Sequence, residues 1–375
     1  IANLIATPGA DGVISLREAI TASNNTAGGP HTINFNISGC GGVCTITPTS
    51  ALPTITRAVT IDGWSQPGWT SAPLIELNGT SAGGGSHGLY LNTSGNTIRG
   101  LAINRFGQNG IYIHTNANNN TVQGNYIGLG ADGTTAYANG GSGILVFTSS
   151  GNTIGGTAAN TGNVISANGG SGVYIDQAGS SNNALYGNLI GLASDGSTDR
   201  GNTSDGVLLS SADGTQIGDG TVSGRNVISG NGGNGVYNSI ATNTVIIGNY
   251  IGTNAAGTAA VANAANGVTL FWTSSVQIGG STAGHGNVIS GNTGSGIGGG
   301  NTGTTLIIQG NYIGTNAAGS AAIANGANGI DVSTSVTIGG TAAGAGNLIS
   351  GNTGRGIFFN NTAGSGFTAT VQGNY

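Results

Sequence analysis

Short apolar runs, separated by Gly, Asn, Ser and Thr, recur along most of this 375-residue chain. One stretch contains three of them: Asn226-Val227-Ile228, Gly235-Val236-Tyr237 and Thr244-Val245-Ile246-Ile247. Brief runs bounded by turn-forming residues predict β-strands. Helical periodicity is absent through these repeats, and Gly and Asn are poor helix formers. The pattern therefore predicts an all-β fold.

The middle run of each set alternates with a period of two, which places successive side chains on opposite faces of a strand. We expect the following pairs to point inward: Ile111/Ile113, Ile144/Val146, Val173/Ile175, Val207/Leu209, Val268/Leu270, Ile330/Val332 and Ile357/Phe359. The residues between them are expected to face outward: Tyr112, Leu145, Tyr174, Leu208, Thr269, Asp331 and Phe358.

A Gly-Asn-Tyr-Ile motif, or a close relative of it, recurs with a nearly constant period. Its asparagines are 63, 61, 62 and 63 residues apart, at Asn125, Asn188, Asn249, Asn311 and Asn374. A second motif, typified by Gly-Asn-Val-Ile-Ser at Asn287, divides each period into two coils. Such a period indicates a solenoid, and three strands in each coil indicate a parallel β-helix. Equal residues of neighbouring coils then stack, with Asn ladders at the corners.

The repeat predicts one β-solenoid domain over residues 1–375. Within it we expect an N-terminal cap region at 1–30, early irregular coils at 31–95, and regular coils with a two-coil repeat of about 62 residues at 96–375. Near the start, Ser15 precedes Leu16 and Glu18 in the pattern of a capping box. This predicts a short amphipathic helix that closes the first coil.

The same segment, Ser15-Leu16-Arg17-Glu18-Ala19, matches five of the six residues of the CSLREA element, with Ile14 in place of Cys. Thr32-Ile33-Asn34-Phe35 and Val59-Thr60-Ile61-Asp62-Gly63 follow it as in that family's first coils. Over about residues 10–70 the chain therefore resembles secreted or surface-displayed bacterial and archaeal proteins with right-handed parallel β-helix repeats. The resemblance implies this fold and export, and it implies little about activity.

Charge is scarce, at 5% of residues, and the net charge is −5. All seven basic residues are Arg, and they form no basic run, so nucleic-acid binding is not expected. No apolar segment is long enough to predict a transmembrane helix. Since the chain begins at Ile1, we expect a mature or trimmed protein. The resemblance implies that it is secreted or held at the cell surface.

Two cysteines, Cys40 and Cys44, flank a Gly-rich turn. A local disulfide is the first interpretation, and it fits an extracytoplasmic setting. Two free thiols are the alternative, whereas a metal site needs more ligands than this region offers.

Acidic residues gather between 195 and 219, and Asp132 aligns with Asp195 one period earlier. One interpretation is a calcium or glycan contact formed by Asp132, Asp195, Asp199 and Asp205. The alternative is turn chemistry, because Asp132, Asp195 and Asp205 are each followed by Gly. We expect no catalytic residues, no resident metal and no cofactor, with structural calcium as the exception left open.

A column of residues follows the repeated Asn, including Tyr126, Leu189, Tyr250, Tyr312 and Tyr375. If Asn and Ile point inward, this column points outward as an apolar interaction stripe. The alternative is that the loops after these strands fold over it. The last coil ends at Tyr375 without a polar cap. Either the sequence is a piece of a longer chain, or a partner docks there, and head-to-tail docking of copies would build a filament.

Two functional hypotheses follow. The first is an exported, non-catalytic solenoid with a structural or adhesive role. Its copies would stack end to end as subunits of an extracellular filament, or it would contact other surface proteins or glycans. The second is a polysaccharide-binding or polysaccharide-cleaving β-helix protein, similar to a lyase or hydrolase, that uses the acidic residues.

Overall fold

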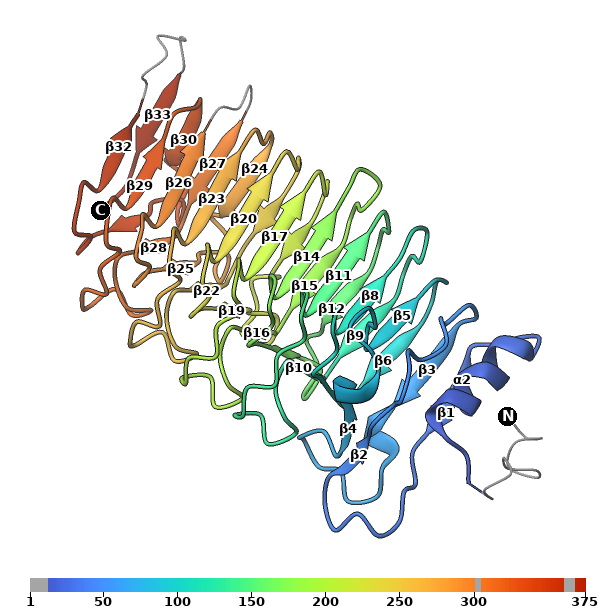
Figure 1. Cartoon of the computed structure of the whole chain (residues 1–375). Helices are drawn as coiled ribbons and strands as arrows, with labels where there is room; N and C mark the ends of the chain where they lie inside the picture. The colour runs from blue at the N-terminus through green and yellow to red at the C-terminus, as the bar shows by residue number, and fades with distance from the viewer. Residues whose placement is uncertain (1–12, 301–304, 361–367) are drawn as a thin grey trace.

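The computed structural model describes residues 13–300, 305–360 and 368–375. The chain winds through these residues into an elongated, gently curved stack of coils, with the N-terminal helix at one end and the last strands at the other (Figure 1). Three sheets run along the stack, and consecutive strands of each sheet belong to successive coils. The predicted parallel β-helix with three strands per coil is therefore confirmed.

Helix α2 (Leu16–Asn25) lies beside β1 at the N-terminal end of the stack (Figure 1). The backbone N–H of Glu18 donates to Ser15 Oγ, and the Glu18 carboxylate accepts from the backbone N–H of Ser15. Leu16 and Ile20 are buried and belong to the same core cluster as the coils. The capping box and the amphipathic helix that were predicted from the sequence are both present.

Sheet A contains twelve strands, and neighbouring strands in it are parallel. They are β1 (His31–Asn34), β3 (Val59–Asp62), β6 (Thr97–Arg99), β9 (Thr121–Gln123), β12 (Thr153–Gly155), β15 (Ala184–Tyr186), β18 (Gln216–Ile217), β21 (Val245–Ile246), β24 (Val276–Gly279), β27 (Leu306–Gln309), β30 (Val336–Gly339) and β33 (Ala369–Gln372).

Sheet B contains eleven strands, most of them only two residues long. They are β2 (Cys44–Ile46), β4 (Ile75–Asn78), β7 (Leu101–Asn104), β10 (Tyr126–Ile127), β13 (Val164–Ile165), β16 (Leu189–Ile190), β19 (Val227–Ile228), β22 (Tyr250–Ile251), β25 (Val288–Ile289), β28 (Tyr312–Ile313) and β31 (Leu348–Ile349). Two short 3-10 helices, η1 (Gly63–Ser65) and η2 (Gly79–Ser81), lie among the first coils.

Sheet C contains ten strands and holds the alternating runs singled out in the sequence. They are β5 (Leu89–Leu91), β8 (Ile111–Ile113), β11 (Ile144–Phe147), β14 (Val173–Asp176), β17 (Val207–Ser210), β20 (Val236–Ser239), β23 (Val268–Phe271), β26 (Ile297–Gly300), β29 (Ile330–Val332) and β32 (Ile357–Phe359). The predicted inward pairs from Ile111 to Val332 are buried, and Ile357 and Phe359 in the last coil are half-buried.

Asparagines stack along the interior in ladders, as the repeat predicts. In the longest one, each side-chain amide donates to the carboxamide oxygen of the Asn in the next coil. Its members are Asn125, Asn163, Asn188, Asn226, Asn249, Asn287, Asn311, Asn347 and Asn374. A second ladder runs from Asn139 to Asn352. The buried amides of these two ladders are thus satisfied along the rod axis, which fixes the register of the coils.

In the described part of the chain, no helix combines the length and the apolar character that crossing a membrane requires.

Candidate functional site: the outer face of sheet C

The outward side chains of sheet C form a column in which each residue lies beside its counterpart in the next coil. The strand register aligns Tyr90, Tyr112, Leu145, Tyr174, Leu208, Tyr237, Thr269, Gly298, Asp331 and Phe358. Apart from Gly298, the side chains of this column are half-buried, and outside β26 and the last coil their inward neighbours are buried. The predicted outward residues therefore face outward. A second column, at the ends of the same strands, includes Phe147, Asp176, Ser210, Ser239, Phe271 and Gly300. We call these columns together the outer face of sheet C.

Five rings gather on this face at the first three strands of the sheet. We define His87, Tyr90, Tyr112, His114 and Phe147 as the aromatic cluster. The rings of Tyr90 and Tyr112 are stacked with centroids 4.9 Å apart, and His87 lies 4.8 Å from Tyr112. His114 packs edge-on against both tyrosines and lies 6.1 Å from Phe147 in a stacked orientation. Parallel strands bring these residues together because their spacing of about 4.8 Å matches that of stacked rings.

Tyr112 and Tyr174 on this face keep their protons at neutral pH. Burial raises the pKa of Tyr112, and the neighbouring Tyr90 and Asp176 raise it further. Burial and a hydrogen bond with Asp176 raise the pKa of Tyr174, although a hydrogen bond with Ser210 opposes this shift. Both phenols therefore remain neutral hydroxyl groups that can donate and accept hydrogen bonds.

His87 is also neutral at pH 7, because burial lowers its pKa. Its Nδ1 accepts a hydrogen bond from the backbone N–H of Asn109, at 3.3 Å. The proton of the neutral ring is then on Nε2. The aromatic cluster accordingly offers flat rings and neutral polar edges.

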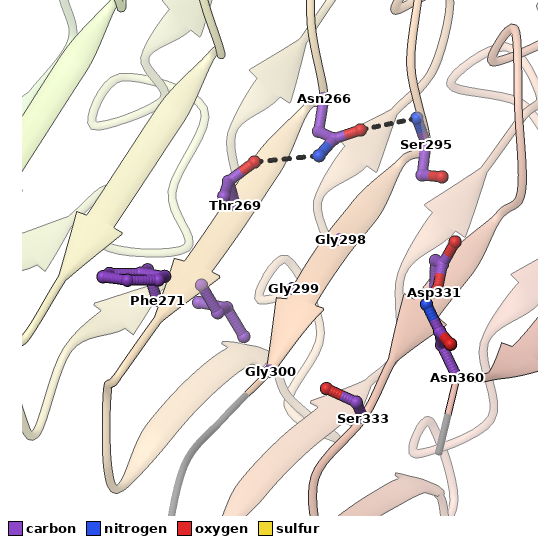
Figure 2. A pocket seen from close by; sticks show the side chains of 11 residues that line it. Asn266, Thr269, Phe271, Ser295, Gly298, Gly299, Gly300, Asp331, Ser333 and Asn360 are labelled. Atoms are coloured by element: carbon purple, nitrogen blue, oxygen red, sulfur yellow. Dashed lines mark hydrogen bonds between the residues drawn. The ribbon is translucent and has the colours of Figure 1, made fainter. Parts of the chain in front are cut away.

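Towards the other end of the face, the surface is hollowed where β26 carries three consecutive glycines (Figure 2). The hollow encloses about 340 Å³. Its lining includes Asn266, Thr269, Phe271, Ser295, Asp331, Ser333 and Asn360 around Gly298, Gly299 and Gly300. It therefore combines one aromatic ring, one carboxylate and several neutral polar groups.

The acidic residues singled out in the sequence accept hydrogen bonds from nearby backbone groups. Asp132 Oδ1 accepts from the backbone N–H groups of Thr134 and Thr135, and Asp195 Oδ1 accepts from those of Ser197 and Thr198. These contacts are typical of turns.

The other two acidic residues also accept backbone hydrogen bonds. Asp199 accepts from the backbone of Gly201, while Asp205, just before β17, accepts from the backbone and side chain of Asn234. Within the described residues, no group of three or more His, Cys, Asp and Glu could hold a metal ion. The contacts of Asp132, Asp195 and Asp199 are local, as the turn interpretation expects, whereas Asp205 bonds to the next coil. A calcium or glycan contact at these residues stays a prediction.

The column that follows the repeated Asn is largely covered by hairpins. Antiparallel bridges close them at Leu129–Ala136, Leu192–Asp199, Thr253–Ala260 and Thr315–Ala322. The hairpins also contact one another, since the backbone N–H groups of Ser194, Ala255 and Ala317 donate to Gly133, Gly196 and Gly257.

The side chains of Tyr126, Leu189, Tyr250 and Tyr312 are half-buried beside these hairpins, and Tyr375 is 85% exposed. The hairpins lie beside this column between residues 126 and 313, as the loop interpretation expects. An interaction stripe along the column stays a prediction.

A disulfide joins Cys40 and Cys44 beside the first strand of sheet B. Cys44 is buried within β2, and the described residues contain no free cysteine.

The alternation in the sequence predicts that Tyr112 and Tyr174 face outward, but it does not connect them with His87, His114 or Phe147. The repetition of Tyr at the aligned positions 90, 112, 174 and 237 is the signal that could have revealed the aromatic cluster.

No family model matches the chain, and no curated protein matches it. Among solved structures it resembles the A-module of the mannuronan C-5 epimerase AlgE4 of Azotobacter vinelandii, with 18% identity and a TM-score of 0.42 over 84% of this chain and 64% of that one. It also resembles the periplasmic alginate epimerase AlgG, with 13% identity and a TM-score of 0.45 over 84% and 69% of the two chains. The Dettilon tailspike protein gives 14% identity and a TM-score of 0.45 over 95% and 64%. The chain thus spans about two thirds of the length of these structures. The likeness concerns the fold alone, and sites differ widely within one fold.

Proposed function

We propose that this chain is an extracellular glycan-binding β-solenoid, which holds a polysaccharide along the outer face of sheet C. The observation that carries the proposal is the aromatic cluster, in which five neighbouring rings lie half-buried on one face. Sugar rings have apolar C–H faces and polar hydroxyl edges. Stacked rings with hydroxyl and amide groups beside them match both features.

The arrangement of the face suits an extended polymer. Its columns continue over ten parallel strands, so equivalent side chains repeat along the rod axis at about 4.8 Å. The aromatic cluster lies at β5, β8 and β11, and Phe271 lies four strands beyond β11, on β23. A chain of sugars lying along the rod would reach both.

We propose that the protein binds the polysaccharide without cleaving it. A glycosidase that uses two carboxyl groups holds them about 5–10 Å apart. Asp176 is aligned with Ser210 in the neighbouring strand, and Ser210 lies five residues beyond Asp205 in the sequence. If the chain is extended from Asp205 to Ser210, the Cα atoms of the two aspartates are roughly 17 Å apart, which is wider than such a pair.

An extracytoplasmic location agrees with the Cys40–Cys44 disulfide, because disulfides persist in oxidising compartments. It also agrees with the resemblance of the N-terminal segment to exported β-helix proteins. An adhesive role would follow from glycan binding at the cell surface. End-to-end assembly stays a prediction, to be tested by sedimentation at high concentration and by electron microscopy.

The proposal is tested by screening the protein against a glycan array and measuring the affinity for any hit by calorimetry. Tyr112→Ala should weaken binding about tenfold, equivalent to ~1.4 kcal/mol, whereas Tyr112→Phe should retain most of the affinity. Tyr186→Ala is the matched control, because Tyr186 is a half-buried tyrosine on β15 of sheet A.

Two results would refute the proposal: a parent protein that binds no glycan, or equal effects of Tyr112→Ala and Tyr186→Ala. Assays for new reducing ends and for unsaturated sugars on the same hits would detect cleavage, which would replace binding alone with an enzymatic function.

A further inference from the structure

Strand β26 departs from the pattern of sheet C. It continues from Ile297 as Gly298, Gly299 and Gly300, while β23 has Thr269, Leu270 and Phe271 in register with them. On the other side, Asp331 and Val332 of β29 align with Gly298 and Gly299. Glycine weakens a strand because it raises the entropy of the unfolded chain and packs no side chain. Glycine in a strand often marks a bulge, a bend, or a place where a ligand or another backbone approaches closely.

The missing side chains leave a gap that is two strand spacings wide. Phe271 and Thr269 stand on one side and Asp331 and Ser333 on the other, across the bare backbone of β26 (Figure 2). Two spacings amount to about 10 Å between the backbones of the walls. The enclosed 340 Å³ falls at the lower end of ligand-site volumes, which start at about 300 Å³. That volume suits a single sugar ring.

The floor of the hollow has to be glycine. Gly299 has a φ of +112°, and a Cβ atom added to it would lie 2.0 Å from the carbonyl oxygen of Leu270. Side chains are therefore excluded at this position by the backbone itself. The floor remains bare, and a ring can rest directly on it.

The walls supply the polar contacts in fixed positions. Asn266 donates from Nδ2 to Thr269 Oγ1 at 2.9 Å and accepts from the backbone N–H of Ser295 at 2.8 Å (Figure 2). Asp331 accepts from Asn328 Nδ2 at 2.9 Å. These contacts orient the amide and the carboxylate before a ligand arrives, which lowers the entropic cost of binding.

The charge of the lining residues distinguishes neutral glycans from polyuronates as ligands of the hollow. Asp331 is the charged residue among those that line the hollow, and no Lys or Arg is among them. The chain contains no Lys at all. A uronic-acid carboxylate in the hollow would lie close to Asp331 without a cation between them, and repulsion in a partly desolvated site costs affinity. Sugar hydroxyls, in contrast, donate readily to a carboxylate.

From these observations we infer that the hollow is a subsite for one unit of an uncharged glycan, with Phe271 stacking on the ring and Asp331 accepting from its hydroxyl groups. The inference rests on the proposed function and adds the class of ligand to it. It also separates this face from sites that bind polyuronates.

The test compares neutral oligosaccharides with oligouronates of equal length, by calorimetry on the full chain. Neutral ligands should bind at least tenfold more tightly to the parent protein. Phe271→Ala should weaken that binding about tenfold. Asp331→Asn should weaken it several-fold and should improve binding of the oligouronates, since it removes the repelling charge. Tyr186→Ala is again the control and should change neither affinity.

Trp272 offers a second measurement, because its ring lies 6.2 Å from that of Phe271 and its side chain is 60% exposed. Neutral ligands should change the tryptophan fluorescence of the parent protein, and Trp272→Phe should abolish the change.

The outcomes are distinguishable. Two results would overturn the subsite and leave the proposed function standing, provided that Tyr112→Ala still weakens glycan binding. The first is that the parent protein prefers oligouronates. The second is that Phe271→Ala and Asp331→Asn bind neutral ligands with full affinity. A parent protein that binds no glycan would overturn both.

Discussion

The side-chain amide of Asn188 donates to the carboxamide oxygen of Asn226, 2.9 Å away in the next coil. The same oxygen accepts the backbone N–H of Asn188 at 3.0 Å. Asn226 in turn donates to Leu185 and to the next asparagine in the ladder, Asn249. Each amide in the ladder therefore joins its own coil to two others, and a single side chain satisfies several buried backbone and side-chain groups.

Replacing Asn226 with Ala should destabilise the protein by about 3 kcal/mol or more, because each buried polar group left without a partner costs roughly 1–3 kcal/mol. Asn316→Ala is the matched control, since the Asn316 side chain hydrogen-bonds within its own hairpin. It should cost about 1 kcal/mol, the usual value for a local capping contact. Denaturant unfolding followed by circular dichroism measures both. Equal effects of the two substitutions would show that the ladder adds nothing beyond a local contact.

Much of the fold could be predicted because each repeat carries the residues that define its own coil and its own buried face. The period of the Asn motif defines the coil, and the alternation at Ile111 and Ile113 identifies the buried face of sheet C. The ladders follow from the same two facts, since equal residues stack when coils stack.

The candidate site could not be predicted in this way, because it depends on which outward residues align across coils of unequal length. Tyr90 and Tyr112 are 22 residues apart, whereas Thr269 and Gly298 are 29 residues apart. The hollow further requires the absence of side chains, which a search for reactive residues does not detect. The hairpins that cover Tyr250 were visible in the sequence as loops, but the direction in which they fold depends on their contacts with one another.

The stacked hairpins leave no room for a larger residue at Gly257. It has a φ of +66°, and an added Cβ atom would lie 2.7 Å from Ala317 Cβ and 2.8 Å from Tyr250 Cε2. Gly257→Ala should therefore destabilise the protein by more than the ~1 kcal/mol that a left-handed backbone conformation costs. Gly39→Ala is the control for that conformational cost, because Gly39 has a φ of +80° and nothing lies within 4 Å of an added Cβ atom.

Thermal unfolding of the two glycine variants gives the comparison, and limited proteolysis shows whether the hairpin at Thr253–Ala260 opens. If Gly257→Ala were no worse than Gly39→Ala, the hairpins would not be packed as the structure shows.

The hairpin aspartates should make stability depend on pH below 4. Hydrogen bonds from the side chain and backbone of Thr198 and from the backbone of Ser197 lower the pKa of Asp195 from 3.8 to about 2. The unfolded chain binds the proton more readily, so the ionised carboxylate stabilises the folded state above pH 4. That contribution is lost as the pH falls through 2.

We expect Asp195→Asn to flatten the fall of the melting temperature between pH 4 and pH 2. Thr198→Val should raise the pKa of Asp195 towards its ordinary value in a carboxyl NMR titration, because it removes the side-chain donor. For Asp132, burial opposes ionisation, but hydrogen bonds from Thr135 and Thr134 outweigh it and lower the pKa to about 2. Thr135→Val is therefore the control, which should move the pKa of Asp132 and not that of Asp195. An unchanged Asp195 pKa in Thr198→Val would contradict this explanation.

The Cys40–Cys44 disulfide should have a local and modest effect. It closes a loop of only five residues, for which the chain-entropy model gives about 2 kcal/mol. A Cys40→Ala, Cys44→Ala double variant should lose about that much or less, and alanine avoids placing a hydroxyl at the buried position of Cys44. Hydrogen exchange should accelerate at β2 and its neighbour β4, while β16, in the middle of sheet B, should be unaffected.

This local behaviour is expected because each coil contacts only its neighbours, so a defect at one end of a solenoid weakens that end first. Glycan binding at sheet C should therefore survive in the double variant. Loss of protection along the whole rod would instead mean that the first coils nucleate the fold, and that the disulfide acts on all of it.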